Sequence, residues 1–258
     1  MLGRKQHISN QDWLDAMKSI EHSCPRSRID EITARTAAEC RQRCFGKRVA
    51  YSWSGGKHSI VLGDLCEKAG VKQCFIVICD LEYPEFLQWV TDNMPDELEV
   101  VNTGQNLKWL SQHQEMLFPQ VSSTAAKWFH IVQHRGQAQY YKAHKLDLII
   151  LGRRKADGNY VGRGTNIYTN AQGVTRFSPI SDWTHEEVLA YLHYNSLPLP
   201  PFYNWKNGYY CGTHPWAARQ WTGSIENGWK EVYDIDRSIV EDAARLIPSA
   251  KAFLDKIK

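Results

Sequence analysis

The chain has 258 residues, of which 43% are hydrophobic and 23% are charged. These values are typical of a globular protein with one large domain and a substantial core. The formal net charge of +3 is compatible with an anionic ligand or a nucleic acid but requires neither. No stretch approaches the roughly 18 apolar residues of a membrane span, and no apolar run follows the charges of residues 1–7. The sequence therefore predicts no membrane segment and no secretory signal, and we expect a cytoplasmic protein.

Residues 1–45 are predicted to form a helical N-terminal extension. Asn10 is a candidate cap for a helix through Trp13, and a second helix is expected from about residue 29 to residue 44. Cys40 and Cys44 lie four residues apart in that second helix, but no second ligand pair accompanies them. The chain has seven cysteines and no Cys-x-x-Cys pair, so we predict reduced thiols and no metal site.

Short apolar runs alternate with helical segments in the part of the chain that follows. Strands are predicted at 48–53, 74–79, 98–101 and 146–151, and helices at 59–69, from Pro84 onward, and at 124–144. This alternation predicts the α/β class, with a doubly wound and mainly parallel sheet. We expect the domain built on this sheet to comprise residues 46–216.

Three polar segments follow predicted strands directly: Ser54–Ser59, Asp80–Glu85 and Gly152–Asp157. The carboxyl ends of parallel strands lie at one edge of a sheet, and ligands of such folds bind there. We therefore expect the three segments to meet on one rim.

The C-terminal third of the sequence is less regular. Residues 163–173 are rich in glycine and asparagine and predict a flexible loop or lid. Thr184 and Glu187 form a capping box for a further helix. Residues 197–216 are predicted to be an ordered irregular addition, and residues 217–258 a helical C-terminal extension that ends in a helix at 248–257. Five tryptophans of this region either fill a core or form an aromatic surface for a partner: Trp183, Trp205, Trp216, Trp221 and Trp229.

A candidate phosphate loop lies between the first predicted strand and its helix, with the sequence Ser54-Gly55-Gly56-Lys57-His58-Ser59. Glycines let the backbone approach an anion closely, and their amides and the helix N-terminus point partial positive charge at it. Ser54 and Ser59 add hydroxyl donors and Lys57 adds a cation. The spacing differs from the Walker loop, Gly-x-x-x-x-Gly-Lys-Ser/Thr. The alternative is a tight strand-to-helix turn that holds no ligand.

This loop resembles the pyrophosphate loop (PP-loop) of the N-type ATP pyrophosphatases, which belong to the adenine nucleotide alpha hydrolase-like superfamily. Within that superfamily the chain is most similar to the phosphoadenylyl-sulfate (PAPS) reductase-like group. Three further segments carry the resemblance, which covers about residues 45–216: Val77–Glu85, Leu151–Asp157 and Phe177–Tyr203. The resemblance implies a fold that binds ATP or an adenylyl-sulfate nucleotide. Members that use ATP adenylate a substrate and release pyrophosphate.

The resemblance also implies roles for individual residues. The pyrophosphate site would comprise Ser54, Gly55, Gly56, Lys57 and Ser59. Asp80 would lie in the loop on the nucleotide side, and Gly152 in the segment whose arginines, Arg153 and Arg154, contact phosphate or sulfate. Arg163 is a further anion ligand. Catalysis would then depend on positioning and charge neutralisation by Lys57, Arg153 and Arg154.

Two positions depart from the family pattern. His58 stands where the loop usually has an aspartate that helps to hold Mg²⁺, so it either pairs directly with a phosphate oxygen or marks a loss of catalysis. Cys211, followed by His214, resembles the cysteine that sulfonucleotide reductases carry nearer to their C-terminus. It is either a nucleophile or a small residue in a glycine turn. The paired cysteines of relatives with iron–sulfur clusters are missing, so we predict no cluster.

Three functions follow from these observations. The first is an enzyme that binds ATP with Mg²⁺ and adenylates an acceptor, in sulfur or nucleic-acid modification metabolism. The second is a sulfonucleotide reductase-like enzyme that uses Cys211. The third is a non-catalytic nucleotide-binding subunit of a partner complex, with the C-terminal tryptophans as its contact surface. Each implies an adenine nucleotide as partner, and each is compatible with a homo-oligomer.

Overall fold

A six-stranded sheet organises the chain in the computed structural model, which describes residues 8–220 and 222–257. The order of the strands is β3-β2-β1-β4-β6-β5. All neighbours pair in parallel except β5 and β6, which form an antiparallel hairpin. The predicted α/β class with a mainly parallel sheet is therefore confirmed. The strand bounds are β1 Val49–Ser52, β2 Cys74–Ile78, β3 Leu98–Asn102, β4 Leu148–Ile150, β5 Ile167–Thr169 and β6 Thr175–Phe177.

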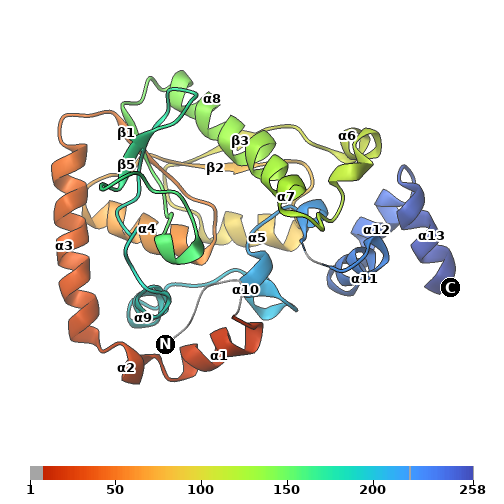
Figure 1. Cartoon of the computed structure of the whole chain (residues 1–258), viewed down its shortest axis with the longest axis horizontal. Helices are drawn as coiled ribbons and strands as arrows, with labels where there is room; N and C mark the ends of the chain where they lie inside the picture. Colours follow the sequence, from red (N-terminus) through yellow and green to blue (C-terminus); the bar gives the residue numbers. More distant parts are fainter. Residues whose placement is uncertain (1–7, 221, 258) are drawn as a thin grey trace.

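Helices cover both faces of the sheet (Figure 1). One face carries α4 (Lys57–Lys68) and α5 (Pro84–Asn93), which connect β1 to β2 and β2 to β3. The other face carries α7 (Ser122–Phe129), a π-helical turn (His130–His134) and α8 (Arg135–Ala143), which precede β4. The direction of winding thus reverses between β1 and β4, which is the point where ligands bind in doubly wound sheets.

Local sequence signals account for the starts of several elements. Pro84 occupies the first turn of α5, where its missing amide hydrogen costs no hydrogen bond. The hydroxyl of Thr184 accepts from the amide of Glu187, and the Glu187 carboxylate accepts from the amide of Thr184. This predicted capping box starts α9 (His185–Tyr194). Strand β2 is apolar along its length because helices bury both of its faces.

The N-terminal helices are α1 (Asn10–Lys18), α2 (Ile20–Ser23) and α3 (Arg26–Cys44). The cap of α1 is Ser9, whose hydroxyl accepts from the amide of Asp12, and not Asn10 as predicted. The amide oxygen of Asn10 instead accepts from the backbone of Tyr209. A distant partner therefore determines the role of Asn10, and the sequence around it gives no sign of that partner.

Two predictions about chain regularity need refinement. The helix predicted at 124–144 is present as α7 and α8, but the π-helical turn His130–His134 joins them and interrupts the α-helical hydrogen bonding. The loop predicted at 163–173 contains β5, which pairs with β6 in the register Tyr168↔Arg176. Strands of three residues are too short to show a period of two, so the sequence pattern missed them.

The remaining segments complete the ends of the molecule. They are α6 Leu107–Gln112, α10 Gly208–Cys211, α11 Ile225–Ile235, α12 Arg237–Ala243, α13 Pro248–Ile257 and the 3-10 turns Gln114–Met116, Lys155–Asp157, Pro201–Asn204 and Trp216–Ala218. Trp183, Trp216 and Trp229 are buried in the core, and Trp205 packs against Tyr83 and Phe202. The three buried tryptophans therefore do not form the aromatic partner surface considered above. Trp221 and residues 1–7 lie outside the described residues. The structure therefore does not test the prediction that residues 1–7 begin no secretory signal.

No helix in the described ranges 8–220 and 222–257 has the length and apolar character needed to cross a membrane.

Gly136 fixes the distance between α8 and β2. A Cβ atom added to it would lie 2.3 Å from Cγ1 of Val77. Replacing glycine by alanine at an exposed helical site raises the free energy of unfolding by about 1 kcal/mol. Overpacking a filled interior lowers that free energy by about 1–3 kcal/mol. We expect Gly136→Ala to lower the free energy of unfolding by about 1–3 kcal/mol in urea denaturation. Adding Val77→Ala should recover part of that loss; a single variant more stable than wild type would contradict this packing.

Candidate functional site

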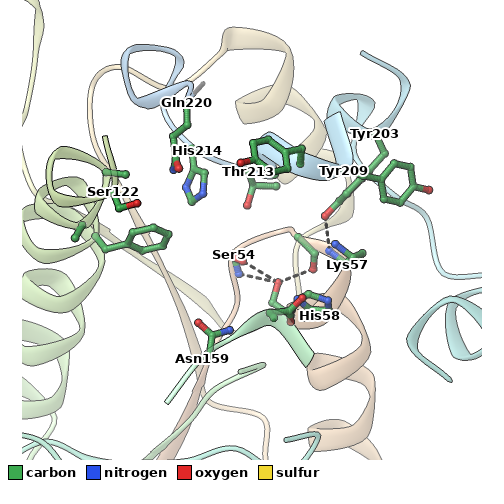
Figure 2. A pocket seen from close by; sticks show the side chains of 18 residues that line it. Ser54, Lys57, His58, Ser122, Asn159, Tyr203, Tyr209, Thr213, His214 and Gln220 are labelled. Carbon is green, nitrogen blue, oxygen red and sulfur yellow. Dashed lines mark hydrogen bonds and ion pairs between the residues drawn. The ribbon is translucent and has the colours of Figure 1, made fainter. Parts of the chain in front are cut away.

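Two adjoining cavities lie at the carboxyl ends of β1 and β4, with volumes of about 480 and 430 Å³. They share Ser54, His58, Ser59, Asn159, Thr213 and His214 as lining residues, so they form one cleft. Figure 2 shows the residues that line the first cavity. Gly56, Lys57, Tyr209 and Tyr210 line only the first cavity, and His134, Gln137, Gly152 and Arg153 line only the second. The phosphate-loop segment and the segment after β4 therefore meet on one rim.

Ser59 organises the loop between β1 and α4. Its hydroxyl accepts from the amide of Ser54 at 2.9 Å and donates to the carbonyl of Gly56 at 2.9 Å. The hydroxyl of Ser54 lies 3.1 Å from it. Within the described chain the amides of Gly55 and Gly56 donate no hydrogen bond to another residue. Gly56 lines the first cavity, so its amide can donate to an anion there.

Gly55 is required by the geometry of the turn. Its φ angle is +66°, and an added Cβ atom would lie 2.9 Å from the ring of Phe86. Gly56 differs, because its φ angle is −80° and an added Cβ would find only ordinary contacts of 3.4 Å or more, the nearest to Ser54 and Thr213. The first glycine thus permits the turn, and the second leaves open the space beside its amide.

Lys57 lies at the start of α4, and its ammonium group is held by aromatic rings. The Nζ atom lies 4.7 Å from the ring centroid of Trp13. It lies farther from the ring centroids of Tyr203 and Tyr209, at 5.6 and 5.7 Å. Its backbone amide donates to the hydroxyl of Tyr203 at 2.8 Å. The side chain is only 3% exposed, so cation–π contacts fix its charge at the back of the first cavity.

Arg154 does not contact the cleft, and the expectation that it binds phosphate is corrected. Its guanidinium is fully buried and donates to both oxygens of Asp157, at 3.1 and 3.0 Å. It also donates to the carbonyl of Trp183 and to Nδ1 of His185. The His185 ring stands perpendicular to Trp13, with centroids 4.7 Å apart. Arg154 therefore positions the residues behind the loop.

Arg153 points the other way, into the second cavity. Its Nη1 donates to the hydroxyl of Tyr168 and its Nη2 to Nε2 of His134, each at 2.9 Å. Burial is the first cause that lowers the pKa of His134, to about 4, and the nearby Arg176 and Arg153 lower it further. His134 is therefore neutral near pH 7, and the Arg153 contact places its ring hydrogen on Nδ1.

Three predicted site residues lie outside the cleft. Asp80 is exposed and accepts from the side-chain amide of Asn102 at 2.5 Å. Arg163 is exposed in the loop before β5. Cys211 is 6% exposed in α10, and its neighbours Tyr210 and Gly212 line the first cavity whereas it does not. The geometry therefore brings together Ser54–Ser59, Gly152 and Arg153 and leaves these three residues apart.

The charges of the cleft fit an anion better than a protein-bound cation. Asp157 is the one carboxylate among the lining residues of either cavity, and Arg154 already occupies both of its oxygens. His58 lies with Nδ1 3.7 Å from Asp157. The described residues contain no group of three or more histidine, cysteine or carboxylate side chains that could hold a metal. The linings of the two cavities therefore offer Mg²⁺ no carboxylate that is not already engaged by Arg154.

Several cleft residues were not predicted from sequence. Tyr203 and Tyr209 come from the segment predicted to be irregular, and His134 and Gln137 come from the π-helical turn and α8. Trp13, which lines neither cavity but contacts Lys57, comes from the N-terminal extension. Asp157 lies in a segment that the sequence pattern had singled out, and its acidic side chain beside two arginines was the available signal.

The strand order, with a glycine turn between β1 and α4, is that of an adenine nucleotide alpha hydrolase-like fold. A sequence model of the phosphoadenosine phosphosulfate reductase domain matches residues 48–211. The chain therefore belongs to the phosphoadenosine phosphosulfate reductase family. A curated relative, the phosphoadenosine 5′-phosphosulfate reductase of Gloeobacter violaceus, is 25% identical over 169 residues, which are 63% of this chain and 68% of that protein.

Two solved structures share the fold. The PAPS reductase of Candida auris, in a phosphate complex, has a TM-score of 0.51 at 16% identity, and the aligned part is 69% of this chain and 90% of that chain. The U34-tRNA thiolase NcsA of Methanococcus maripaludis, with its [4Fe-4S] cluster, has a TM-score of 0.51 at 16% identity and covers 91% of this chain and 82% of its own. At these identities the likeness concerns the fold alone.

Arg153 and Arg154 are neighbours in the sequence, but only Arg154 forms a buried ion pair, with Asp157. The same substitution at each position therefore tests the contribution of that ion pair. Arg154→Met leaves the Asp157 carboxylate, 6% exposed, without its partner. Loss of one member of a buried pair costs about 3–5 kcal/mol. We expect that loss in the free energy of unfolding, measured in urea, and a loss of about 1 kcal/mol for Arg153→Met, which removes only hydrogen bonds to neutral groups. Equal losses would contradict the assignment of the two arginines.

The two buried histidines predict a pH dependence of stability. Burial, followed by a neighbouring arginine, lowers the pKa of His185 to about 4, as burial does for His134. Between pH 6.5 and 4 the unfolded chain binds protons that the folded chain does not, so stability falls as the pH falls through this window. His134→Gln and His185→Gln should each make that fall shallower in urea titrations at several pH values. The exposed His22→Gln is the control, and equal slopes in all four proteins would refute the prediction.

Proposed function

We propose that the chain binds ATP with its phosphates on Ser54–Ser59 and transfers the adenylyl group to an acceptor, with release of pyrophosphate. The observation that carries this proposal is the Gly56 amide, which has no partner in the described chain and lines a cavity of about 480 Å³. The ordered hydroxyls of Ser54 and Ser59 and the N-terminus of α4 lie beside it. Amides and a helix N-terminus together favour phosphate oxygens.

The chemistry would depend on stabilising the leaving group. The nucleophile of the acceptor attacks the α-phosphorus, and the bond from that phosphorus to the α–β bridging oxygen breaks. Pyrophosphate leaves with the electron pair, and the proton of the nucleophile passes to water. Donors that are fixed before the reaction stabilise the charge that develops on the leaving oxygen. In this chain the Gly56 amide is such a donor, because the Ser59 hydroxyl fixes the loop by bonding to the amide of Ser54 and the carbonyl of Gly56.

Lys57 would supply fixed positive charge behind the leaving group. The aromatic contacts with Trp13, Tyr203 and Tyr209 hold its ammonium group in one place, so little reorganisation is needed when charge develops. Trp13 lies in the N-terminal extension. We accordingly propose that residues 1–45 and 217–258 are extensions of a nucleotide-binding domain at 46–216, and that the first of them contributes Trp13 to the surroundings of Lys57.

The cleft residues do not provide the carboxylates that Mg²⁺ prefers, since His58 replaces the usual aspartate and Arg154 engages Asp157. We therefore propose no step through a metal held by the protein. Mg²⁺ that reaches the cleft would come bound to the phosphates of ATP.

A sulfonucleotide reductase is the second candidate, favoured by the match to the reductase domain. In that reaction a thiol must reach the sulfur of the bound nucleotide. The Cys211 thiol is buried, and Cys211 does not line the first cavity although both of its neighbours do. This arrangement supports the adenylation proposal over the reductase proposal.

The test compares ATP binding by the full chain and by Gly56→Ala in calorimetric titrations. The added methyl group fits the fold but occupies the space beside the free amide. We expect unchanged thermal stability and at least about a tenfold loss of ATP affinity, equivalent to about 1.4 kcal/mol. Equal affinities for ATP in both proteins would refute the loop as the phosphate site.

Turnover separates the three functions. Release of pyrophosphate from ATP in the presence of pooled acids, amines or tRNA, undiminished in Cys211→Ser, supports adenylation. Preference for adenosine 5′-phosphosulfate over ATP, with activity lost in Cys211→Ser, supports the reductase. Tight ATP binding without release, together with co-purification of a partner protein, supports a non-catalytic subunit.

A further inference from the structure

Positive charge is concentrated in one part of the chain, residues 116–181, which we call the basic segment. It contains nine lysines and arginines and two carboxylates, a net charge of +7, whereas the whole chain has a net charge of +3. The rest of the chain therefore has a net charge of −4. The basic segment runs from α7 to β6, and residues of α7 and of the loop after β4 line both cavities. Such an asymmetry of charge is typical of proteins that bind a polyanion.

The carboxylates of the basic segment do not neutralise its exposed cations. Asp147 and Asp157 each form an ion pair with an arginine, at 3.4 and 3.0 Å. Lys155 pairs with Asp182, which lies outside the segment. Within residues 8–220 and 222–257, five exposed cations of the segment have no carboxylate at ion-pair distance: Lys127, Arg135, Lys142, Lys145 and Arg163. Their charges can therefore attract a ligand from solution.

Three of these side chains, Lys127, Arg135 and Lys142, form a basic stripe along α7 and α8. Seven residues make about two turns of α-helix, and the π-helical turn between Lys127 and Arg135 takes up an extra residue. The spacings of eight and then seven residues therefore place the three side chains on one side. Figure 1 shows α7 and α8 as one long helix. At about 1.5 Å per residue the stripe is about 22 Å long, enough to span several phosphates of a nucleic-acid strand.

The basic stripe begins at the mouth of the cleft. Ala126 and Phe129, on either side of Lys127, line both cavities. Phe129 is 41% exposed, and its ring stands perpendicular to the ring of His214, with centroids 5.1 Å apart. Bases of single-stranded nucleic acids stack on aromatic rings of this kind, beside basic side chains that follow the backbone. The end of the stripe therefore has both features that hold an unpaired nucleotide.

We propose that the basic stripe binds the phosphates of a single nucleic-acid strand and that Phe129 stacks against an unpaired base of this strand at the cleft. The attraction of phosphates to lysine and arginine does not depend on sequence. A strand fits this surface better than an anionic bilayer does, because the stripe is one helix wide and leads into a concave site. The strand would carry the acceptor of the adenylyl group, and this last part rests on the proposed function.

The test measures binding of a short, fluorescein-labelled single strand of mixed sequence to the full chain by fluorescence anisotropy at several salt concentrations. RNA and DNA strands of one sequence are titrated in parallel, and the tighter of the two identifies the natural partner. The variant is the triple Lys127→Gln, Arg135→Gln and Lys142→Gln. We expect at least about a tenfold loss of affinity near 0.1 M salt and a slope of log affinity against log salt that is shallower by about 2, because each lost phosphate contact removes about 0.7.

The control is a triple variant with the same loss of charge elsewhere, at exposed lysines without ion pairs in the described residues: Lys72→Gln, Lys108→Gln and Lys251→Gln. It should change the affinity for the strand by less than about threefold. Phe129→Ala should weaken binding of the single strand at least about fivefold and leave binding of the duplex of the same sequence unchanged. Thermal melts verify that each variant folds.

Two further measurements separate this proposal from the proposed function. The stripe residues line neither cavity, so ATP affinity should be the same in the stripe variant and in wild type. Stripe-dependent binding of the strand without release of pyrophosphate from ATP would refute adenylation and leave the nucleic-acid surface standing. Equal affinity of wild type and the stripe variant for the strand, or no binding by either, would overturn the surface. Stripe-dependent binding to phosphatidylserine vesicles but not to RNA or DNA would overturn it as well.

Discussion

The turn from β1 into α4 is the constraint on which the rest of the cleft depends. The chain leaves the sheet through Gly55, whose φ of +66° and contact with Phe86 exclude any side chain. This turn presents the Gly56 amide and the first residues of α4 to the cavity. Ser59 then fixes the loop from within by bonding to the amide of Ser54 and the carbonyl of Gly56. Phosphate-loop chemistry requires amides that are held in place and not satisfied by the protein, and this turn provides both.

The support behind the loop is made by residues that are distant in sequence. Asp157 and Arg154 form a buried ion pair, Arg154 donates to His185, and His185 stands against Trp13. Trp13 in turn lies over the ammonium group of Lys57. The N-terminal extension thus supports the cleft from behind, because one aromatic ring from α1 contacts the ammonium group of the loop lysine.

The charges at the cleft favour negative ligands. Its lining contains one carboxylate, which Arg154 neutralises, while Lys57 lines the first cavity and Arg153 the second. The replacement of the usual loop aspartate by His58 continues this trend, because it removes a negative charge from the place where phosphates would bind. Under the proposed function, such a site would hold anions through fixed N–H donors and charged side chains.

Local signals in the amino-acid sequence were sufficient for the sheet class, the phosphate-loop segment, the start of α5 and the capping box of α9. Each of these depends on residues within a few positions of one another, such as Thr184 and Glu187. The roles of Arg153 and Arg154 were decided only by tertiary packing. On an extended backbone, consecutive side chains point to opposite sides, and the side that met Asp157 and His185 became structural. The burial of Cys211, the π-helical turn at His134 and the strand that carries Arg176 likewise depend on distant contacts, which a short stretch of sequence does not record.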